Sequence, residues 1–485
     1  MLTIILVIFL VGYLLIALEH PLKINKAASA LLTGTLLWIV YMGIAPDLPF
    51  AVEGTAFQSF IQSPEIHSLP LDEQMKRFIL SHQIVESLGE ICSTLVFLIG
   101  AMTIVELIDA HGGFVLITNR IKTRKKRTLL IITTVLTFFM SAILDNLTTA
   151  IVMTMLIRKL IKEQYYQWLF SSVVIIAANS GGVWSPIGDV TTIMLWVKGN
   201  VTAGSIISNL ILPSLVSTFV PMYLILKKLD GDIVCPPQAR TDETNKRKHL
   251  GLYERFSILI LGLIALISVP LFKMQTQLPP FMGILFGISL LWIYTEALYS
   301  RKKEMEEKDK YRMERVIHQV DGGTLLFFLG ILLAVDVLRY TEMLNTFSEW
   351  LDVNVGNVYA VNLLIGGLSS IVDNVPLVAG AIGMYPVATE EVILHSVDAA
   401  YMMNFMQDGT FWQFLAYCAG VGGSMLIIGS AAGVVVMGLQ KINFLWYLKH
   451  ISRLAAAGYL SGAIVFILQS LLLSSHLNSI KIAFK

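Results

Sequence analysis

The chain has 485 residues, of which 55% are apolar and 14% are charged, and its formal net charge is +1. Soluble domains carry about 25% charged residues, so this composition excludes a soluble globular protein and predicts one embedded in a membrane. A net charge this small identifies no charged partner, and we expect a lipid bilayer around the chain and no bound nucleic acid. The cysteines Cys92, Cys235 and Cys418 lie too far apart in sequence for a disulfide framework or a metal site.

Apolar stretches of about 20 residues, the length needed to cross a bilayer, recur along the whole chain. Ten are expected to be full spans: residues 2–18, 27–45, 89–108, 167–197, 205–226, 256–272, 280–299, 322–340, 411–439 and 451–474. The first stretch lacks the basic start and the cleavage site of a signal peptide, so we expect an uncleaved span. Ten crossings place both termini outside, which leaves Lys481 and Lys485 on the disfavoured side of the membrane.

Two further apolar stretches are each interrupted near the middle by an Asp-Asn pair. They are residues 128–161, with Asp145-Asn146, and residues 357–387, with Asp373-Asn374. About 30 residues of straight helix would extend about 45 Å, whereas the hydrocarbon core is about 30 Å thick. Each stretch is therefore either one overlong span or a hairpin that enters and leaves on the same side.

The charges that flank these two stretches decide between the alternatives. Basic residues surround 128–161, between Arg120 and Arg127 on one side and between Arg158 and Lys162 on the other, whereas acidic residues flank the second stretch. Basic loops lie in the cytoplasm. Both stretches are therefore predicted to be hairpins, the first entering from the cytoplasm and the second from the outer face.

Similar sequences recur in the two halves of the chain. Three landmarks repeat in the same order, at separations of 230, 228 and 241 residues: Thr94–Gly100 with Thr324–Gly330, Asp145-Asn146 with Asp373-Asn374, and Gly181-Gly182 with Gly422-Gly423. Because the two hairpins are predicted to enter from opposite faces, the halves would be inverted repeats. We expect a first repeat at 1–229, a cytoplasmic linker at 230–255 and a second repeat at 256–485.

Glycine clusters also interrupt the spans 167–197 and 411–439, and non-helical backbone at membrane depth is tolerated only where it is buried or lines a wet cavity. The predicted fold class is an all-α polytopic membrane protein, built from inverted repeats with two re-entrant helical hairpins and two broken transmembrane helices. The two hairpin tips and the two breaks can meet at the middle of the membrane and form an ion site.

The acids at the hairpin tips indicate an ion-binding function. A charged residue at the centre of a membrane helix costs roughly 2.5–3.5 kcal/mol on insertion scales. Asparagine or serine would cap a returning half-helix without burying a charge, which favours an ion-binding role for Asp145 and Asp373. For Asn146 and Asn374, helix capping and ion coordination are both open.

The break in the span 167–197 is rich in oxygen atoms. Carboxylate, amide and hydroxyl oxygens suit a small hard cation such as Na+, and this break supplies them from Asn179, Ser180, Asp189, Thr191 and Thr192. Either threonine could instead donate to a carbonyl of the preceding turn. Their position beside Asp189 favours a cation site.

A second group of polar residues could contribute to the same function. Ser424 and Ser430 are the neutral equivalents in the second break. Glu106 and Asp336 lie near the ends of their spans, where each is either a buried coupling residue or an acid that reaches the membrane surface. The lone histidine His111 is expected to be solvated in a loop.

Three segments, Ser141–Met155, Asn179–Thr192 and Ser369–Pro376, resemble those of the NhaD-type sodium/proton antiporters of the ion transporter superfamily. The resemblance follows the chain in order over nearly its whole length. It implies secondary active transport that exchanges Na+ or Li+ for H+ by alternating access, in a bacterial inner membrane or a plastid envelope and without a cofactor. It also implies a homodimer formed by a scaffold domain, with the hairpins in a transport domain.

The resemblance further implies which polar residues bind the proton or the cation. Carried over by position, they are Ser141, Asp145, Asn146, Asn179, Asp189, Thr191, Thr192, Ser369 and Asn374. Among them, Na+ is expected at Asp145, Asn146, Asp189, Thr191 and Thr192. Ser424 and Ser430 align only loosely with the family pattern.

Two other functions compete with cation exchange. A sodium-coupled anion or carboxylate carrier, or an arsenite permease, of the same superfamily would need hairpin tips that attract an anion, whereas Asp145 and Asp373 would repel one. An intramembrane aspartyl protease would need a Gly-x-Gly-Asp string, but the chain reads Pro186-Ile-Gly-Asp189, and neither a metalloprotease nor a nucleophile motif appears. We therefore expect a transporter and not an enzyme.

Overall fold

The computed structural model describes residues 2–17, 19–113, 116, 123–233, 251–302, 310–396 and 398–483. Within these ranges the regular elements are helices, together with one isolated β-bridge between Lys125 and Asp232. Eight of the described helices are long and apolar enough to cross a membrane, or up to ten if each of two sharply bent helix pairs counts as one span. The prediction of an all-α polytopic membrane protein is confirmed.

Parts of the predicted cytoplasmic segments fall outside the described residues. Residues 234–250 belong to the predicted linker 230–255, and residues 303–309 follow the predicted span 280–299. The side of the membrane on which each loop lies, and the boundaries of the two repeats, stay predictions.

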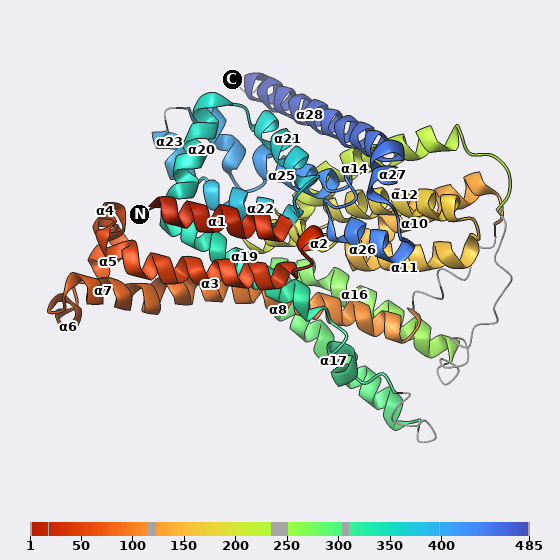
Figure 1. Cartoon of the computed structure of the whole chain (residues 1–485), viewed down its shortest axis with the longest axis horizontal. Coiled ribbons are helices and arrows are strands. Elements are labelled where there is room, and N and C mark those ends of the chain that lie inside the picture. Colours follow the sequence, from red (N-terminus) through yellow and green to blue (C-terminus); the bar gives the residue numbers. More distant parts are fainter. Residues whose placement is uncertain are drawn as a thin grey trace. The chain divides into compact units, whose positions relative to one another are not determined.

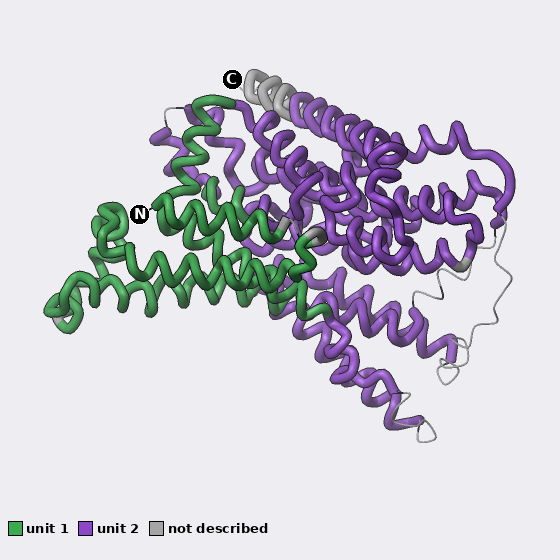
Figure 2. Tube along the Cα trace, viewed as in Figure 1, with its two compact units in different colours: residues 1–98, 321–356, 379–386 green, residues 99–320, 357–378, 387–485 purple. Residues whose placement is uncertain are grey.

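The chain divides into two compact units, which Figure 2 shows in different colours. Unit 1 comprises residues 1–98, 321–356 and 379–386. Its helices are α1 (Leu2–Ala17), α2 (Glu19–Leu22), α3 (Lys26–Ile44), α4 (Pro49–Glu53), α5 (Thr55–Phe60), α6 (Pro64–His67), α7 (Leu71–Phe78), the first part of α8 (Ile84–Ala110), α19 (Gly322–Tyr340), α20 (Met343–Asn354) and the last part of α22 (Asn374–Met384). In its core, the ring of Tyr340 packs against Trp38 and Tyr41 of α3, at centroid distances of 5.9 and 6.4 Å.

Unit 2 comprises residues 99–320, 357–378 and 387–485. Its further helices are α10 (Lys126–Leu144), α11 (Asn146–Leu160), α12 (Gln164–Val183), α13 (Val190–Val197), α14 (Ala203–Leu226), α16 (Leu252–Thr276), α17 (Pro280–Ser300), α18 (Met313–Ile317), α21 (Val358–Ser369), α23 (Glu390–His395), α24 (Ala399–Met402), α25 (Thr410–Gly422), α26 (Ala431–Gln440), α27 (Phe444–His450) and α28 (Ser452–Ala483). Both Asp-Asn pairs and both broken spans belong to this unit.

The first Asp-Asn pair stands at the tip of a helical hairpin. Helix α10 begins beside the start of α12, where the Lys126 ammonium lies 4.0 Å from the centre of the Tyr166 ring. After the turn at Asp145, α11 returns to the same end of α12, where the Gln167 side chain donates to the carbonyl of Ile161 at 2.7 Å. The chain therefore runs along α12 and back again, and α10, α11 and α12 lie side by side (Figure 1).

The turn of this hairpin has a local cause. Asp145 adopts φ 90° and ψ 157°, which ends α10. Its carboxylate then accepts a hydrogen bond from the backbone N–H of Thr148 at 2.7 Å and caps α11. One residue thus both breaks the first helix and starts the second.

The second Asp-Asn pair has the same arrangement. Helix α21 begins beside the start of α25, where the Asn362 side chain donates to the carbonyl of Phe411 at 3.2 Å. After the tip, the chain returns to that end, because the backbone N–H of Ala388 donates to the carbonyl of Phe405 at 3.0 Å, just before α25. This stretch is also a hairpin.

Matching hydrogen bonds hold the two tips against the broken spans. The hydroxyl of Ser141 donates to the carbonyl of Ala178 on α12 at 2.6 Å. The hydroxyl of Ser369 donates to the carbonyl of Ala419 on α25, also at 2.6 Å. The serines are 228 residues apart and the carbonyls 241 residues apart, the separations found in the sequence.

The backbones also approach each other in the same way in both repeats. A Cβ atom added to Gly181 would lie 2.2 Å from the carbonyl oxygen of Phe138, and one added to Gly422 would lie 2.3 Å from that of Gly366. No side chain fits at such a distance, so glycine at both positions allows each hairpin to touch its broken span. The repeat is therefore present in the structure as well as in the amino-acid sequence.

The two broken spans run in opposite directions. The end of α26 lies beside the start of α12, because the indole N–H of Trp168 donates to the carbonyl of Gln440 at 3.0 Å. The start of α25 lies beside the start of α14, because the carboxylate of Asp408 accepts from the backbone N–H of Thr202 at 2.6 Å. Each broken span thus begins where the other one ends, and the repeats are inverted.

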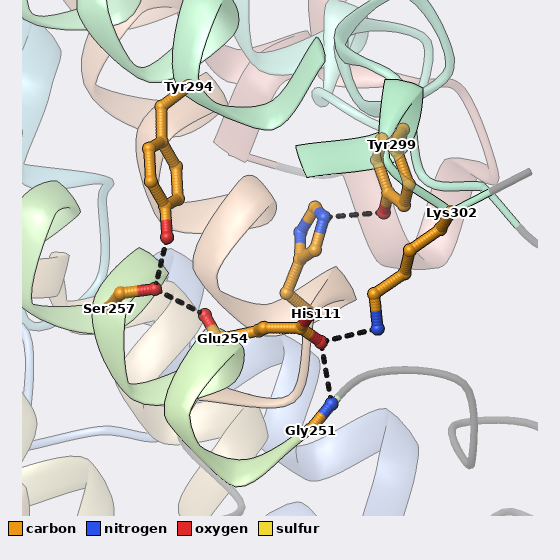
Figure 3. Close-up of polar contacts among 7 residues, drawn as sticks. All are labelled: His111, Gly251, Glu254, Ser257, Tyr294, Tyr299 and Lys302. Atoms are coloured by element: carbon orange, nitrogen blue, oxygen red, sulfur yellow. Dashed lines mark hydrogen bonds and ion pairs between the residues drawn. The ribbon is translucent and has the colours of Figure 1, made fainter. Parts of the chain in front are cut away.

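A polar cluster joins the ends of α8, α16 and α17 (Figure 3). The expectation that His111 is solvated is wrong: it is 1% exposed, because Tyr299, far away in sequence, places its hydroxyl 2.7 Å from Nε2. Nδ1 lies 2.7 Å from the carbonyl of Leu107, which can only accept, so Nδ1 carries the proton and Tyr299 donates to Nε2. Beside them, the Lys302 ammonium lies 2.6 Å from the Glu254 carboxylate.

Candidate cation site

Asp189 lies at the break between α12 and α13 and is only 2% exposed. One carboxylate oxygen, Oδ1, accepts from the backbone N–H of Thr191 at 3.1 Å and caps α13. The other, Oδ2, accepts from the side-chain amides of Asn146 at 3.3 Å and Asn374 at 3.4 Å. Each of these asparagines directly follows the acid at a hairpin tip, so both hairpins meet at Oδ2 of Asp189.

Asn179, near the end of α12, connects this carboxylate to the second break. Its Nδ2 donates to the hydroxyl oxygens of Ser424 at 3.0 Å and Ser430 at 2.9 Å. Its Oδ1 accepts from Asn146 at 3.2 Å, and no part of Asn179 is exposed. Two hairpin tips and two breaks, far apart in sequence, thus share one buried network of hydrogen bonds.

The acids at the hairpin tips are engaged differently from Asp189. The two carboxylate oxygens of Asp145 accept from the backbone N–H and the hydroxyl of Thr148, at 2.7 and 2.9 Å. Asp373 is partly buried at the second tip. The residue that follows each tip acid, Asn146 or Asn374, donates to Asp189, so all three acids border one hydrogen-bonded network.

No ion pair among the described residues involves Asp145 or Asp189. A buried carboxylate without a counter-charge is unfavourable, so either a bound cation or a proton would stabilise Asp189. Carboxylate, amide and hydroxyl oxygens are the ligands that small hard cations prefer. The asparagine amides carry such oxygens, and rotation of an amide group would turn its oxygen toward a bound cation.

The predicted hydroxyl groups have different surroundings. Thr191 is fully buried next to Asp189, and its backbone N–H donates to that carboxylate at 3.1 Å. The hydroxyl of Thr192 donates to the carbonyl of Asp189 at 2.8 Å, within the first turn of α13. The hydroxyl of Ser180 accepts from Ser217 of α14 at 2.9 Å, so the network does not include it directly.

Four other predicted residues lie outside this hydrogen-bonded network. Ser141 and Ser369 donate to backbone carbonyls and hold the hairpins in place. Glu106 is half-buried on α8 and has no hydrogen bond to the network in the described part of the chain. Asp336 belongs to unit 1, where its carboxylate lies 3.4 Å from the Arg339 guanidinium.

One residue that borders the network was not predicted from the sequence. A Cβ atom added to Gly420 of α25 would lie 3.2 Å from Oδ2 of Asp189. The sequence did carry a signal for this position, because the separation of 241 residues that pairs the glycine clusters also pairs Gly420 with Asn179.

Residues 5–406 match the protein family described as CitMHS, citrate transporter. The chain belongs to this family. Over 95% of its length it is 41% identical to Sodium/proton antiporter 1 of Arabidopsis thaliana, of which it covers 71%, and 38% identical to Sodium/proton antiporter 2 of the same plant, of which it covers 98%. It is 31% identical to the Na(+)/H(+) antiporter NhaD of Vibrio cholerae, over 56% of each chain. The resemblance to NhaD-type antiporters found in the sequence is confirmed.

Proposed function

We propose that the protein is a secondary active transporter that exchanges Na+ or Li+ for H+ across a membrane. The observation that carries the proposal is the buried carboxylate of Asp189, which both hairpins reach and which has no cationic partner among the described residues. A cation and a proton would each neutralise this charge, and they would compete for it. By linkage, such competition couples the two fluxes. The relatives named as sodium/proton antiporters support this proposal.

In this proposal Asp189 and Asp145 have different roles. Asp189 binds the cation, with oxygens from Asn146, Asn374 and Thr191 around it. Asp145 carries the proton, and a protonated carboxyl would keep an oxygen for the backbone N–H of Thr148 and so preserve the helix cap. Arrival of the cation would then favour release of the proton, because a positive charge nearby stabilises the ionised carboxylate of Asp145.

Inverted repeats supply a route for alternating access. The two repeats have matching contacts in opposite orientation, so each could adopt the packing that the other shows. Exchange of these two packings would expose one site first to one face and then to the other. The transported ion needs no resident cofactor for this cycle.

A carboxylate carrier is the second candidate, because the matching family is described as a citrate transporter. Asn146 and Asn374 could donate to a carboxylate ligand, as they donate to Asp189. Asp189, Asp145 and Asp373 would, however, repel a negatively charged ligand such as citrate. The charge at the site therefore supports the cation over the carboxylate.

The two functions separate in one experiment. Purified protein is reconstituted in liposomes that contain a pH-sensitive dye, and NaCl, LiCl, KCl, or labelled choline citrate with and without NaCl, is added outside. Cation exchange predicts a rise in internal pH with Na+ or Li+ and no uptake of labelled citrate. Accumulation of citrate without a cation-dependent pH change would overturn the proposed cation exchange and support the carboxylate carrier.

We also propose that the protein acts as a homodimer in a bacterial inner membrane or a plastid envelope. The names of its relatives, from a plant and a bacterium, are compatible with either membrane. The mass of the protein–detergent complex, measured by light scattering with the detergent subtracted, distinguishes a dimer from a monomer.

A further inference from the structure

Helix α27 turns sharply out of the second broken span. Lys441 ends α26 in the left-handed conformation, with φ 54°. The side chain of Asn443 then caps α27, because its oxygen accepts from the backbone N–H of Leu445 at 2.8 Å. The two helices are bent by 114° relative to each other. Since α26 is the second half of a span, a helix at this angle lies closer to the plane of the membrane than to its normal.

Aromatic rings hold α27 against the start of α12. The centroid of the Trp446 ring lies 5.2 Å from that of Trp168 and 6.0 Å from that of Tyr165. The indole N–H of Trp168 also donates to the carbonyl of Gln440, which is 272 residues away in the sequence and directly precedes Lys441. Tryptophan and tyrosine gather where a membrane meets water. These contacts therefore place α27 beside the start of α12 at one surface of the membrane.

The exposed face of α27 is both apolar and basic. Leu445 is 68% exposed and Leu448 is 42% exposed. Lys449, one helical turn after Leu445, is exposed as well, and so are Lys441 and Arg453 just beyond the two ends of the helix. Apolar side chains next to basic ones are typical of a helix that lies in the interface between a membrane and water.

Positive charge predominates around this helix. From residue 409 to its end the sequence contains no Asp or Glu. Exposed Lys162, three residues before Tyr165, adds a further positive charge, and Glu163 beside it leaves the excess positive. The basic cluster consists of Lys162, Lys441, Lys449 and Arg453. No ion pair within the described part of the chain includes a member of this cluster.

We propose that the basic cluster and α27 bind an anionic phospholipid. Lysine and arginine donate to the phosphate oxygens, and the acyl chains cover Leu445 and Leu448. The start of α12 follows a basic segment that is predicted to face the cytoplasm, and the cytoplasmic leaflet is the one that carries anionic lipids. Each basic residue near an anionic surface strengthens binding roughly fivefold. The proposal goes beyond cation exchange and does not depend on it.

The test titrates the delipidated protein in detergent with phosphatidylglycerol or phosphatidylcholine, and native mass spectrometry measures the apparent Kd of the first bound lipid. The unmodified protein binds phosphatidylglycerol at least tenfold more tightly than phosphatidylcholine. Lys441→Gln/Lys449→Gln loses at least tenfold in affinity for phosphatidylglycerol, whereas Lys441→Arg/Lys449→Arg keeps it. Lys227→Gln/Lys228→Gln is the matched control, because it removes the same charge from exposed side chains at the end of α14.

Three results would overturn the proposal. Equal losses of affinity in the two glutamine variants would mean that the lipid responds only to the net charge of the protein. Displacement of phosphatidylglycerol by inorganic phosphate at the same concentration would make this a site for a free anion. If the double variant does not fold, Lys449→Gln on the exposed face of α27 decides, with an expected loss of at least threefold, and an unchanged Kd contradicts the proposal. No transport is measured, so a failure of cation exchange is a separate result.

Discussion

The two repeats of this protein share a backbone and differ in chemistry. In each, a serine at the end of the first hairpin helix donates to a carbonyl of the broken span at 2.6 Å, and a glycine lets the two backbones touch. The positions that face the shared site are unequal. The first repeat presents Asp189 and Asn179, and the second presents Ser430 and Gly420 at the matching places.

The hairpin tips differ in the same sense. Asp145 has φ 90°, a conformation that costs a residue other than glycine about 1–3 kcal/mol, whereas Asp373 is not among the residues with positive φ. The first tip therefore tolerates strain to place a carboxylate. The comparison indicates that the first repeat supplies two of the three acids, Asp145 and Asp189. The second supplies Asp373 together with neutral groups, Asn374 and the two serines that bond Asn179.

The largest expected effect comes from removing the acid that only the first repeat possesses. Asp189→Asn keeps the size of the side chain and removes its charge, so cation-driven proton movement should fall at least 100-fold. Ser430→Ala, at the equivalent position, should lower the rate less than tenfold, because it removes one acceptor of Asn179 and leaves Ser424. Initial rates of internal pH change in proteoliposomes measure both. An equal loss of transport rate in the two variants would contradict the inference that Asp189 and Ser430 have unequal roles.

The acids at the tips give the next comparison. Asp145→Asn keeps an oxygen that can cap α11 but cannot carry a proton, so the protein should fold and insert, with no sodium-driven proton movement at any pH. Asp373→Asn should retain measurable exchange. The two variants are compared by proton flux between pH 6 and 9 and by thermal unfolding in detergent. Normal exchange with unchanged pH dependence in Asp145→Asn would make Asp145 a cap and direct attention to Asp373 as the proton carrier.

A third comparison concerns the ends of the helices α8 and α19, where His111 corresponds to Thr341 at the separation of 230 residues. Burial lowers the pKa of His111 from 6.5 to about 4. Between these values the unfolded chain binds a proton that the folded protein does not, so stability is present above pH 6.5 and is lost as the pH falls toward 4. The shift corresponds to roughly 3 kcal/mol.

Thermal unfolding in detergent at several pH values checks this expectation. His111→Gln cannot titrate and should show a weaker fall of the unfolding temperature between pH 6.5 and 4, although it is less stable than the unmodified protein at pH 8. Thr341→Val, in the other repeat, should leave the pH dependence unchanged. An identical acid destabilisation in His111→Gln would mean that other groups cause it.

The smallest expected effects test whether the two repeats are equivalent where they look alike. Ser141→Ala and Ser369→Ala each remove one buried hydrogen bond of 2.6 Å and leave a carbonyl without its donor. Each should lower stability by about 1–3 kcal/mol, and the two losses should be similar. The unfolding temperatures of the variants measure this. A much larger loss for one serine would show that the hairpins are not held in the same way.

Local sequence signals predicted much of this fold. An Asp-Asn pair inside an apolar run, and glycine clusters inside a span, mark places where a helix cannot continue, and the structure has hairpin turns and breaks there. The repeat could also be recognised in the sequence, because each landmark is a short string of residues at which the backbone turns, breaks or packs closely. These features depend on neighbours within a few residues and can be read along the chain.

The partners of the polar side chains could not be predicted in this way. Asn374 donates to Asp189, which lies 185 residues away in the sequence, whereas Ser180 accepts from Ser217 on another helix. Residue type alone could not show that Asn374 belongs to the network around Asp189 and that Ser180 does not. Gly420 was missed because glycine carries no polar group, and its place beside the Asp189 carboxylate depends on how α25 packs against α12 and α13.

Eight helix ends meet around the shared network, and they have a consequence for the sign of the ion. Helices α11, α13, α22 and α26 begin there, and α10, α12, α21 and α25 end there. The start of a helix acts as about half a positive charge and its end as about half a negative charge, so the eight contributions largely cancel. The backbone then favours neither cations nor anions, and the aspartates alone decide. A framework of this kind could change the sign of the ion it carries by exchanging a few acids, which would let a chain of a family described as citrate transporters resemble sodium/proton antiporters.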